Sequence, residues 1–232
     1  LTLVGILTLV GCSKQPEVTR TTEQMAEAPV TEIVEEPVVV ENVERDSFAG
    51  SHPGIPDLAN QHRRRLIRHA QYHHGLNAPV PIYAAQIHKE STWRKDVCSP
   101  FACGLTQFTD STADYVGEKF EALEDVDVMN PDWAIKAQIL YMDYLRKQSR
   151  AADDCNSWAK ALSAYNGGIG WLRRDEKVTE AEGADKTLWW DNVEVHKDPR
   201  RSDAAVRENT AYPRRISLEL QVLYSESGFA QG

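Results

Sequence analysis

One carboxylic acid, Glu90, stands in a setting that could hold a transferable proton. It lies in a stretch with helical spacing, with the apolar Ile87 before it and Trp93 after it. A carboxyl in a partly apolar site keeps its proton near neutral pH, so it can protonate a poor leaving group such as a glycosidic oxygen. A lone glutamate on a helix is far more often a solvated surface group. Glu90 therefore gains meaning only from its neighbours.

Three further clusters of residues follow Glu90-Ser91 along the chain. The first is Gly104-Leu105-Thr106-Gln107, the second is Ala164-Tyr165-Asn166-Gly167-Gly168, and the third pairs Glu208 with Tyr212 one helical turn later. Each has an ordinary structural interpretation: a turn, a helix stop that uses glycine at positive φ, and a stabilising pair on a helix. Taken singly, none of them indicates a function.

In this order and at this spacing the four clusters resemble the soluble lytic transglycosylase family, over roughly residues 60–225. The lysozyme-like domain of that family carries an E-S motif, a G-L-M-Q motif, an A-Y-N-[AG]-G motif and a late E-x-x-x-Y. The resemblance makes Glu90 the single catalytic acid/base, with the hydroxyl of Tyr165 near its carboxyl and Glu208 as a structural partner. The substrate-binding residues that it implies are Ser99, Gln107, Tyr165, Asn166, Glu208 and Tyr212.

The resemblance also implies a reaction on peptidoglycan. Glu90 would protonate the oxygen between N-acetylmuramic acid and N-acetylglucosamine and then, as a carboxylate, remove the proton of the muramyl C6 hydroxyl. The C6 oxygen closes onto the anomeric carbon, which leaves a 1,6-anhydromuramyl end and consumes no water. No cofactor or metal is needed, and the expected partner of the monomeric enzyme is the glycan strand.

Two positions depart from the family pattern. Thr106 replaces the usual methionine, and Asp110 stands where a proline commonly follows the glutamine. Inverting hydrolysis needs a second carboxylate to activate water, so Asp110 keeps open a hydrolytic muramidase on the same fold. Asp110 also fits the start of a helix, where an acid meets free amide groups, and Asp96 is expected to be a solvated loop residue. A third alternative is a non-catalytic peptidoglycan-binding structural protein, although binding alone would not require a protonatable carboxyl.

The elements that must position these residues can be predicted from apolar spacing. Leu66, Ile67 and Ala70 share one face of a first helix that should stop at Gly75. No convincing alternating strand is present, so we predict a mainly α-helical domain over residues 55–230. Further helices are predicted over 82–94, from Pro131 onward, over 156–165, and along Ile216, Leu220 and Leu223.

Two cysteines, Cys98 and Cys103, flank a short loop before the Gly104 motif. In an oxidising compartment a disulfide there would stiffen the loop, and Cys155 would then be free or paired with an unknown partner. A zinc site is not predicted, because no second closely spaced Cys/His pair accompanies these cysteines. His69 and His73 lie among arginines and are interpreted as a solvated basic face that could contact anionic peptidoglycan.

Residues 1–12 are an apolar stretch that ends in Cys12. Its eleven apolar residues would span only about 16 Å as a helix, which fits a signal peptide better than a membrane span. Leu9-Val10-Gly11-Cys12 resembles the lipobox of bacterial lipoproteins, so Cys12 is predicted to be lipidated and to anchor the protein to a membrane. An ordinary secretion signal is the alternative. Ser13 favours the outer membrane of a Gram-negative host, with the domain in the periplasm.

The net charge of −9 belongs largely to one segment. Residues 13–50 contain nine acidic and three basic groups, a net of −6, whereas residues 51–232 contain 26 acidic and 23 basic groups, a net of −3. A like-charged segment with few aromatic residues cannot offset its ordering entropy, so residues 13–52 are predicted to be a disordered acidic linker. The nearly balanced remainder gives no reason to expect nucleic acid as a partner.

Overall fold

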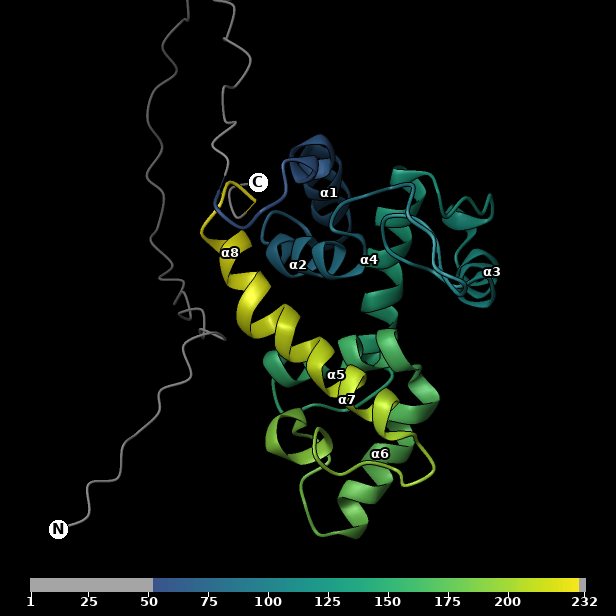
Figure 1. Cartoon of the computed structure of the whole chain (residues 1–232), viewed down its shortest axis with the longest axis vertical. Helices are drawn as coiled ribbons and strands as arrows, with labels where there is room; N and C mark the ends of the chain where they lie inside the picture. The colour runs from purple at the N-terminus through teal and green to yellow at the C-terminus, as the bar shows by residue number, and fades with distance from the viewer. Residues whose placement is uncertain (1–51, 230–232) are drawn as a thin grey trace, which may run out of the picture. The chain divides into compact units, whose positions relative to one another are not determined.

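The computed structural model describes residues 52–229, which form a mainly α-helical domain (Figure 1). No β-strand occurs among the described residues, where only isolated bridges join Cys98 to Cys103 and Cys103 to Phe108. The predicted fold class is therefore confirmed. The helices are α1 (Leu58–His74), α2 (Val80–Ser91), α3 (Asp110–Lys119), η1 (Glu121–Leu123), α4 (Pro131–Lys147), α5 (Asp154–Gly167), α6 (Ile169–Ala181), η2 (Trp189–Val193), α7 (Asp203–Arg214), η3 (Arg215–Leu220) and α8 (Gln221–Ser225).

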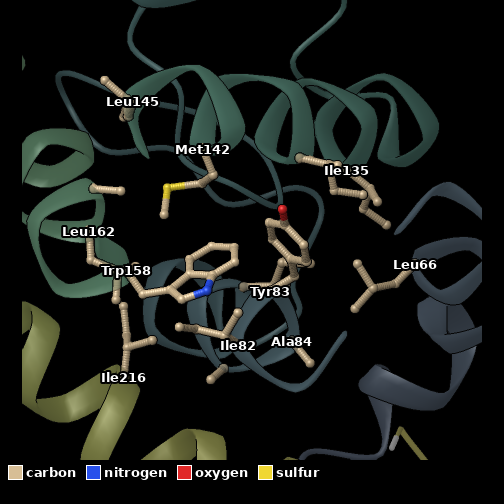
Figure 2. Close-up of a cluster of buried hydrophobic side chains, with 14 of the residues drawn as sticks. Leu66, Ile82, Tyr83, Ala84, Ile135, Met142, Leu145, Trp158, Leu162 and Ile216 are labelled. Atoms are coloured by element: carbon tan, nitrogen blue, oxygen red, sulfur yellow. The ribbon is translucent and has the colours of Figure 1, made fainter. Parts of the chain in front are cut away.

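Helix α2 is the hydrophobic centre of the domain and carries Glu90 in its last turn. It is buried almost throughout, and it packs against α1, η3 and α8. A helix that is apolar on all sides must be enclosed by other elements. Figure 2 shows part of this enclosure, where Tyr83 of α2 meets Trp158 of α5 edge-on with ring centroids 5.4 Å apart. Neighbouring core side chains are Leu66 from α1, Met142 and Leu145 from α4, Leu162 from α5 and Ile216 from η3.

The C-terminal segments α7, η3 and α8 form one rod that runs along the domain (Figure 1). Pro213 lies inside α7 and cannot donate a backbone hydrogen bond, and the helix widens to π-helical geometry over Arg215–Leu220. At its far end the Tyr224 hydroxyl accepts a hydrogen bond of 2.6 Å from Trp93 Nε1. The rod therefore carries Tyr212 near its middle and, at its far end, contacts Trp93, two residues after the end of α2.

The helices predicted from apolar spacing are present, and some of their ends differ from the prediction. Helix α1 stops at Gly75, whose φ is 78°, and α4 begins at Pro131, both as predicted. The prediction that α2 continues to residue 94 was wrong. Thr92 and Trp93 adopt φ of 53° and 63°, in the left-handed region that a right-handed helix cannot include.

Helix α5 begins earlier than expected, helices α6 and α7 were not predicted from apolar spacing, and α3 was predicted only through its start at Asp110. The side chain of Asp153 accepts a hydrogen bond from the Asn156 amide, so the helix starts at Asp154 and not at 156. Helices α3, α6 and α7 lack a long apolar stripe, because each packs on the domain through only a few buried residues.

The predicted signal peptide and the lipidation site Cys12 lie outside the described residues, as does the predicted acidic linker apart from its last residue, His52. Within residues 52–229 no helix combines the length and the apolar character that a bilayer crossing requires.

Candidate active site

The candidate carboxyl Glu90 lies where a helix meets a loop. Its side chain is partly buried, and it belongs to the last turn of α2, where the helix dipole disfavours negative charge. The next residue, Ser91, donates a hydrogen bond of 2.7 Å from Oγ to the backbone carbonyl of Leu105. This bond ties the end of α2 to the Gly104–Gln107 loop and explains why a serine follows the glutamate.

The surroundings of Glu90 raise its pKa to about 7. Burial is the main cause, and the like charge of Glu208 acts in the same direction. A hydrogen bond from Tyr212 and the charge of Lys89 act in the opposite direction. A carboxyl with a pKa near the working pH can both give and take a proton, which is what acid/base catalysis by one residue requires.

Tyr212 is the direct partner of Glu90. Its hydroxyl donates a short hydrogen bond to Glu90 Oε1, and its own oxygen lies 3.3 Å from Nε2 of Gln86. Burial and the neighbouring Glu90 charge raise the pKa of Tyr212 well above its usual value, so the phenol stays neutral and can donate. The ammonium group of Lys89 lies 5.7 Å from the centre of the same ring.

Burial raises the pKa of Tyr165 well above its usual value, and the nearby Glu90 charge adds to this, but the hydroxyl proton of Tyr165 points away from Glu90. Its hydroxyl donates a hydrogen bond of 2.8 Å to the backbone carbonyl of Thr106. Its ring packs against Phe108 and Tyr141 at centroid distances of 5.5 and 5.8 Å. Tyr165 therefore interacts with Glu90 only through charge, whereas Tyr212 donates a hydrogen bond directly to Glu90.

The loop with Gly104 and Gln107 has a backbone that its sequence explains. Gly104 has φ of 81°, and a Cβ atom there would lie 2.0 Å from the carbonyl oxygen of Val128, so only glycine fits. Nε2 of Gln107 donates to the carbonyls of Val97 and Gly104 at 3.0 and 2.8 Å. Both amide protons are therefore committed to the loop, and Gln107 can offer a substrate only its oxygen, as an acceptor.

The predicted disulfide between Cys98 and Cys103 is present, with the two Cα atoms 4.1 Å apart. It closes the loop that precedes the Gly104 motif. Ser99 lies inside this loop and is exposed, and its Oγ accepts hydrogen bonds from the amides of Phe101 and Ala102 at 3.2 and 3.0 Å. These bonds show a local turn, and contact between Ser99 and a sugar stays a prediction.

Asn166 and Glu208 are joined directly at the surface, and Asn166 also contacts a buried network that was not predicted from the sequence. Nδ2 of Asn166 donates to Glu208 Oε1 at 3.3 Å, and Oδ1 of Asn166 accepts from Asn209 at 3.1 Å. Asn209 also accepts from Arg201 at 3.1 Å, and the Arg201 guanidinium is paired with Asp175 at 3.2 Å. The only sequence signal for this network is the Arg, Asn and Asp content of stretches that otherwise have surface character.

The two positions after Asn166 require glycine for different reasons. Gly168 ends α5 with φ of 91°, which is the helix stop expected from the sequence. Gly167 is still helical, and a Cβ atom there would lie 2.2 Å from the guanidinium of Arg201. Gly167 therefore makes room for the buried arginine.

The two aspartates considered as a second carboxylate do not act on Glu90. Asp110 is the exposed first residue of α3, and Asp96 is an exposed loop residue. Neither is among the groups that shift the pKa of Glu90. Asp110 therefore begins a helix, as its simpler interpretation predicted, but the amide of Thr112 is capped by Thr109 and not by Asp110.

Part of the predicted basic face of α1 is solvated as predicted, because Arg64, Arg68 and His73 are exposed. Other residues of this face contact α4. His69 lies 2.9 Å from Asp132, and His73 lies 3.3 Å from Asp143. His73, His74 and Asp143 form a group whose possible metal-ligating atoms lie within 4.8 Å of one another. The same carboxylate oxygen of Asp143 is paired with Lys147 at 2.6 Å, so an ordinary ion pair accounts for the group.

Comparisons with known proteins find a matching family and several relatives. The family described as Transglycosylase SLT domain matches residues 66–188, which include Glu90, Gln107 and Tyr165. Membrane-bound lytic murein transglycosylase F of Pasteurella multocida (strain Pm70) is 32% identical over 113 residues, 47% of this chain and 21% of that protein. The same-named protein of Maricaulis maris (strain MCS10) is 32% identical over 117 residues, 49% of this chain and 24% of that protein.

A third relative of that name, from Thiobacillus denitrificans (strain ATCC 25259 / T1), is 29% identical over 144 residues, 61% of this chain and 27% of that protein. The chain thus spans about a quarter of the length of these curated relatives. The family match covers more than half of the chain and contains the carboxyl whose surroundings are described above. The chain therefore belongs to the transglycosylase SLT domain family.

Proposed function

We propose that this protein is a peptidoglycan lytic transglycosylase that cleaves the β-1,4 bond between N-acetylmuramic acid and N-acetylglucosamine. Membership of the SLT domain family and the names of the relatives support this activity. One observation carries the assignment to Glu90. Burial holds the pKa of this carboxyl at about 7, and Tyr212 donates a hydrogen bond to one of its two oxygens.

In the first step Glu90 acts as the acid. Oε1 of Glu90 accepts the hydrogen bond from Tyr212, so the transferable proton is on Oε2 of Glu90. This second oxygen has no hydrogen-bond partner within the described residues. Transfer of this proton to the bridging oxygen makes the leaving sugar a neutral alcohol. The acetamido group of the muramyl residue stabilises the positive charge that develops at its anomeric carbon.

In the second step the Glu90 carboxylate acts as the base. It removes the proton of the muramyl C6 hydroxyl while that oxygen closes onto the anomeric carbon. The oxygen that left forms the new O–H bond, the C6 oxygen forms the new C–O bond, and Glu90 is protonated again. The observed surroundings favour this route over inverting hydrolysis, because Asp110 and Asp96 are exposed and do not act on Glu90.

Mass spectrometry of the fragments released from purified peptidoglycan tests the proposal. We expect 1,6-anhydromuramyl ends, which are 18 Da lighter than reducing ends; fragments with reducing muramyl ends alone would replace the transglycosylase with a muramidase. Glu90→Gln keeps the shape and the acceptor for Tyr212 but has no transferable proton. We expect a fall in kcat of at least about 100-fold for this variant. A folded Glu90→Gln variant with full activity would remove Glu90 from its role.

The proposal extends to where the enzyme works. We place it in the periplasm, anchored through a lipid on Cys12, as a monomer acting on glycan strands. The relatives are named as membrane-bound proteins, which supports an enzyme that works at a membrane. In a Gram-negative host, labelling with a radioactive fatty acid should mark the wild-type chain and not Cys12→Ser. Equal labelling of the two chains would contradict the lipid anchor.

A further inference from the structure

Two buried glutamines, Gln86 of α2 and Gln138 of α4, are hydrogen-bonded to each other. Gln86 is 1% exposed and Gln138 is 0% exposed, in a region whose other side chains are mostly apolar. A buried amide costs free energy unless it is hydrogen-bonded, and an aliphatic residue of similar size would pack there without that cost. The amides therefore need an explanation beyond packing.

The donors and acceptors in this network can be assigned starting from the backbone carbonyl of Tyr83, which can only accept a hydrogen bond. Nε2 of Gln138 lies 3.2 Å from the backbone carbonyl of Tyr83 and 2.8 Å from Oε1 of Gln86. A carbonyl oxygen has no proton, so the nitrogen of Gln138 must face it, and both protons of that nitrogen are used. Oε1 of Gln86 is therefore an acceptor, and its amide nitrogen points the other way.

The donor and the acceptor can be assigned in the same way in the next two hydrogen bonds, which end at the Glu90 carboxyl. Nε2 of Gln86 lies 3.3 Å from the Tyr212 hydroxyl oxygen, which must accept because the amide nitrogen cannot. The single proton of Tyr212 is then free to donate only to Glu90 Oε1. Every bond from the Tyr83 carbonyl to Glu90 has one permitted direction.

We propose that Gln86 and Gln138 are positioning residues that fix the hydroxyl of Tyr212 as a donor and thereby hold the catalytic proton on Oε2 of Glu90. This inference rests on the proposed function, because it concerns the acid step of that reaction. Without the amides, Tyr212 can rotate and accept a proton from Glu90 Oε1. In that arrangement the carboxyl directs its proton into the protein and away from the glycosidic oxygen.

An unpaired buried oxygen in this network supports a positioning role for the two glutamines. Oε1 of Gln138 is buried and has no hydrogen-bond partner among the described residues. Turning the amide over would satisfy neither the Tyr83 carbonyl nor Gln86, so the orientation that serves Tyr212 is the one that leaves this oxygen unpaired. An unpaired buried acceptor costs about 1–3 kcal/mol. An arrangement kept for stability alone would use apolar side chains.

The test replaces both amides by methionine, as Gln86→Met with Gln138→Met. Methionine has nearly the same length and shape, and changing both partners together leaves neither of them unpaired. Ser217→Ala is the matched control. Ser217 lies in η3, which also packs on α2, and its buried Oγ has no partner within the described structure. We expect kcat on purified peptidoglycan to fall about tenfold in the double variant, with KM within about twofold of the wild-type value and the control unchanged.

Two further measurements separate positioning from packing. In a Tyr212→Phe background, adding the two methionines should change kcat by less than about twofold, because residues that act through one hydroxyl are not additive. Carbon-13 NMR of the Glu90 carboxyl should show a higher pKa in the double variant, since a weaker donor stabilises the carboxylate less. The other groups that interact with Glu90 stay in place: Lys89 on α2, Tyr165 on α5 and Glu208 on α7.

The outcomes are distinct. A folded double variant with wild-type kcat and an unchanged carboxyl pKa overturns the inference and leaves the proposed function standing. A further tenfold fall in the Tyr212→Phe background also overturns it, because the amides would then act by another route. Full activity of Glu90→Gln overturns the proposed function itself, and the NMR titration still reports whether the amides control the carboxyl.

Discussion

At the scale of single residues, the protein holds Glu90 in surroundings that oppose its charge. The side chain is partly buried, a second glutamate acts on it, and it stands in the last turn of a helix. Only Tyr212 and Lys89 favour the ionised form. A group whose ionisation is unfavourable in the folded state is typical of a functional site, where stability is sacrificed for chemistry.

This conflict predicts that removing the charge stabilises the fold at high pH. The pKa of Glu90 rises from 4.5 in the unfolded chain to about 7 in the folded one, so the folded state binds more protons between these values. Stability therefore falls as pH rises through this window, by up to about 3 kcal/mol. Glu90→Gln should gain that much over wild type in urea unfolding at pH 8 and almost none at pH 4. An equal difference at both pH values would contradict the pKa assignment.

Two neighbours of Glu90 should move the pH dependence of kcat in opposite directions. The proposed mechanism needs protonated Glu90, so activity should be lost as pH rises above about 7. Glu208→Gln removes a like charge and should shift this loss to lower pH, while the amide oxygen can still accept from Asn166. Lys89→Gln removes a favourable charge and should shift the loss to higher pH.

Measurements at low and high salt provide the control for the Glu208→Gln and Lys89→Gln variants. Both side chains are exposed, so their effects on Glu90 should shrink at high ionic strength. The pH profiles are measured at low and high salt with the same substrate. Shifts in the same direction, or shifts that salt does not reduce, would show that the two substitutions act by altering the geometry.

At the scale of elements, three glycines around the junction of α5 and α6 should respond differently to alanine. Gly167→Ala places Cβ against Arg201 and Asn209 and should cost about 1–3 kcal/mol, with reduced activity because Asn166 must shift. Gly168→Ala meets no atom but has φ of 91° with ψ of 140°, a conformation that essentially only glycine adopts, so it should cost about 1–3 kcal/mol. Gly170→Ala is the control in open space within α6 and should be neutral or stabilising. Urea unfolding measures the order, and a Gly167→Ala variant as stable as the control would refute the packing argument.

The loop between α2 and α3 should depend on its disulfide. Cys98→Ser with Cys103→Ser removes a short covalent ring, whose loop-closure entropy corresponds to about 2 kcal/mol. The loop also supplies the Val97 and Gly104 carbonyls that hold Gln107. We therefore expect KM to rise several-fold with a smaller change in kcat. Unchanged KM in the double variant would show that the hydrogen bonds suffice to hold the loop.

The elements also show what a sequence can predict. Helices α1 and α4 follow from a long apolar stripe and from Gly75 and Pro131 at their ends. Helices α6 and α7 have few buried positions, so local spacing does not reveal them. Glu90 and its motif partners could be named because their motifs resemble those of the family. The buried amides Gln86 and Gln138 could not, because a glutamine in a helix has the same local pattern whether it faces water or the core.

At the scale of the whole described domain, the two ends of the fold close on the residues that follow α2. Arg63 of α1 donates to the carbonyl of Gly228 at 2.9 Å, and Phe229 is 2% exposed. The Phe229 ring lies 5.6 Å from Trp93 and 5.0 Å from Tyr224. An aromatic cluster of residues far apart in sequence therefore supports the turn at which α2 ends, while Glu90 keeps its own partners on α7.

The aromatic cluster and the partners of Glu90 are different residues, so we expect that a substitution in the cluster can lower stability without lowering activity. Phe229→Ala removes a buried ring and should lower the free energy of unfolding by about 3–5 kcal/mol. Tyr212 still holds Glu90 in the folded molecules, so kcat at 25 °C should stay within about twofold of wild type. Urea unfolding and peptidoglycan turnover are measured on the same preparation, with Phe229→Leu expected to recover most of the stability. A large loss of kcat in Phe229→Ala while it is still folded would mean that the turn after α2 also sets the position of the Glu90 carboxyl.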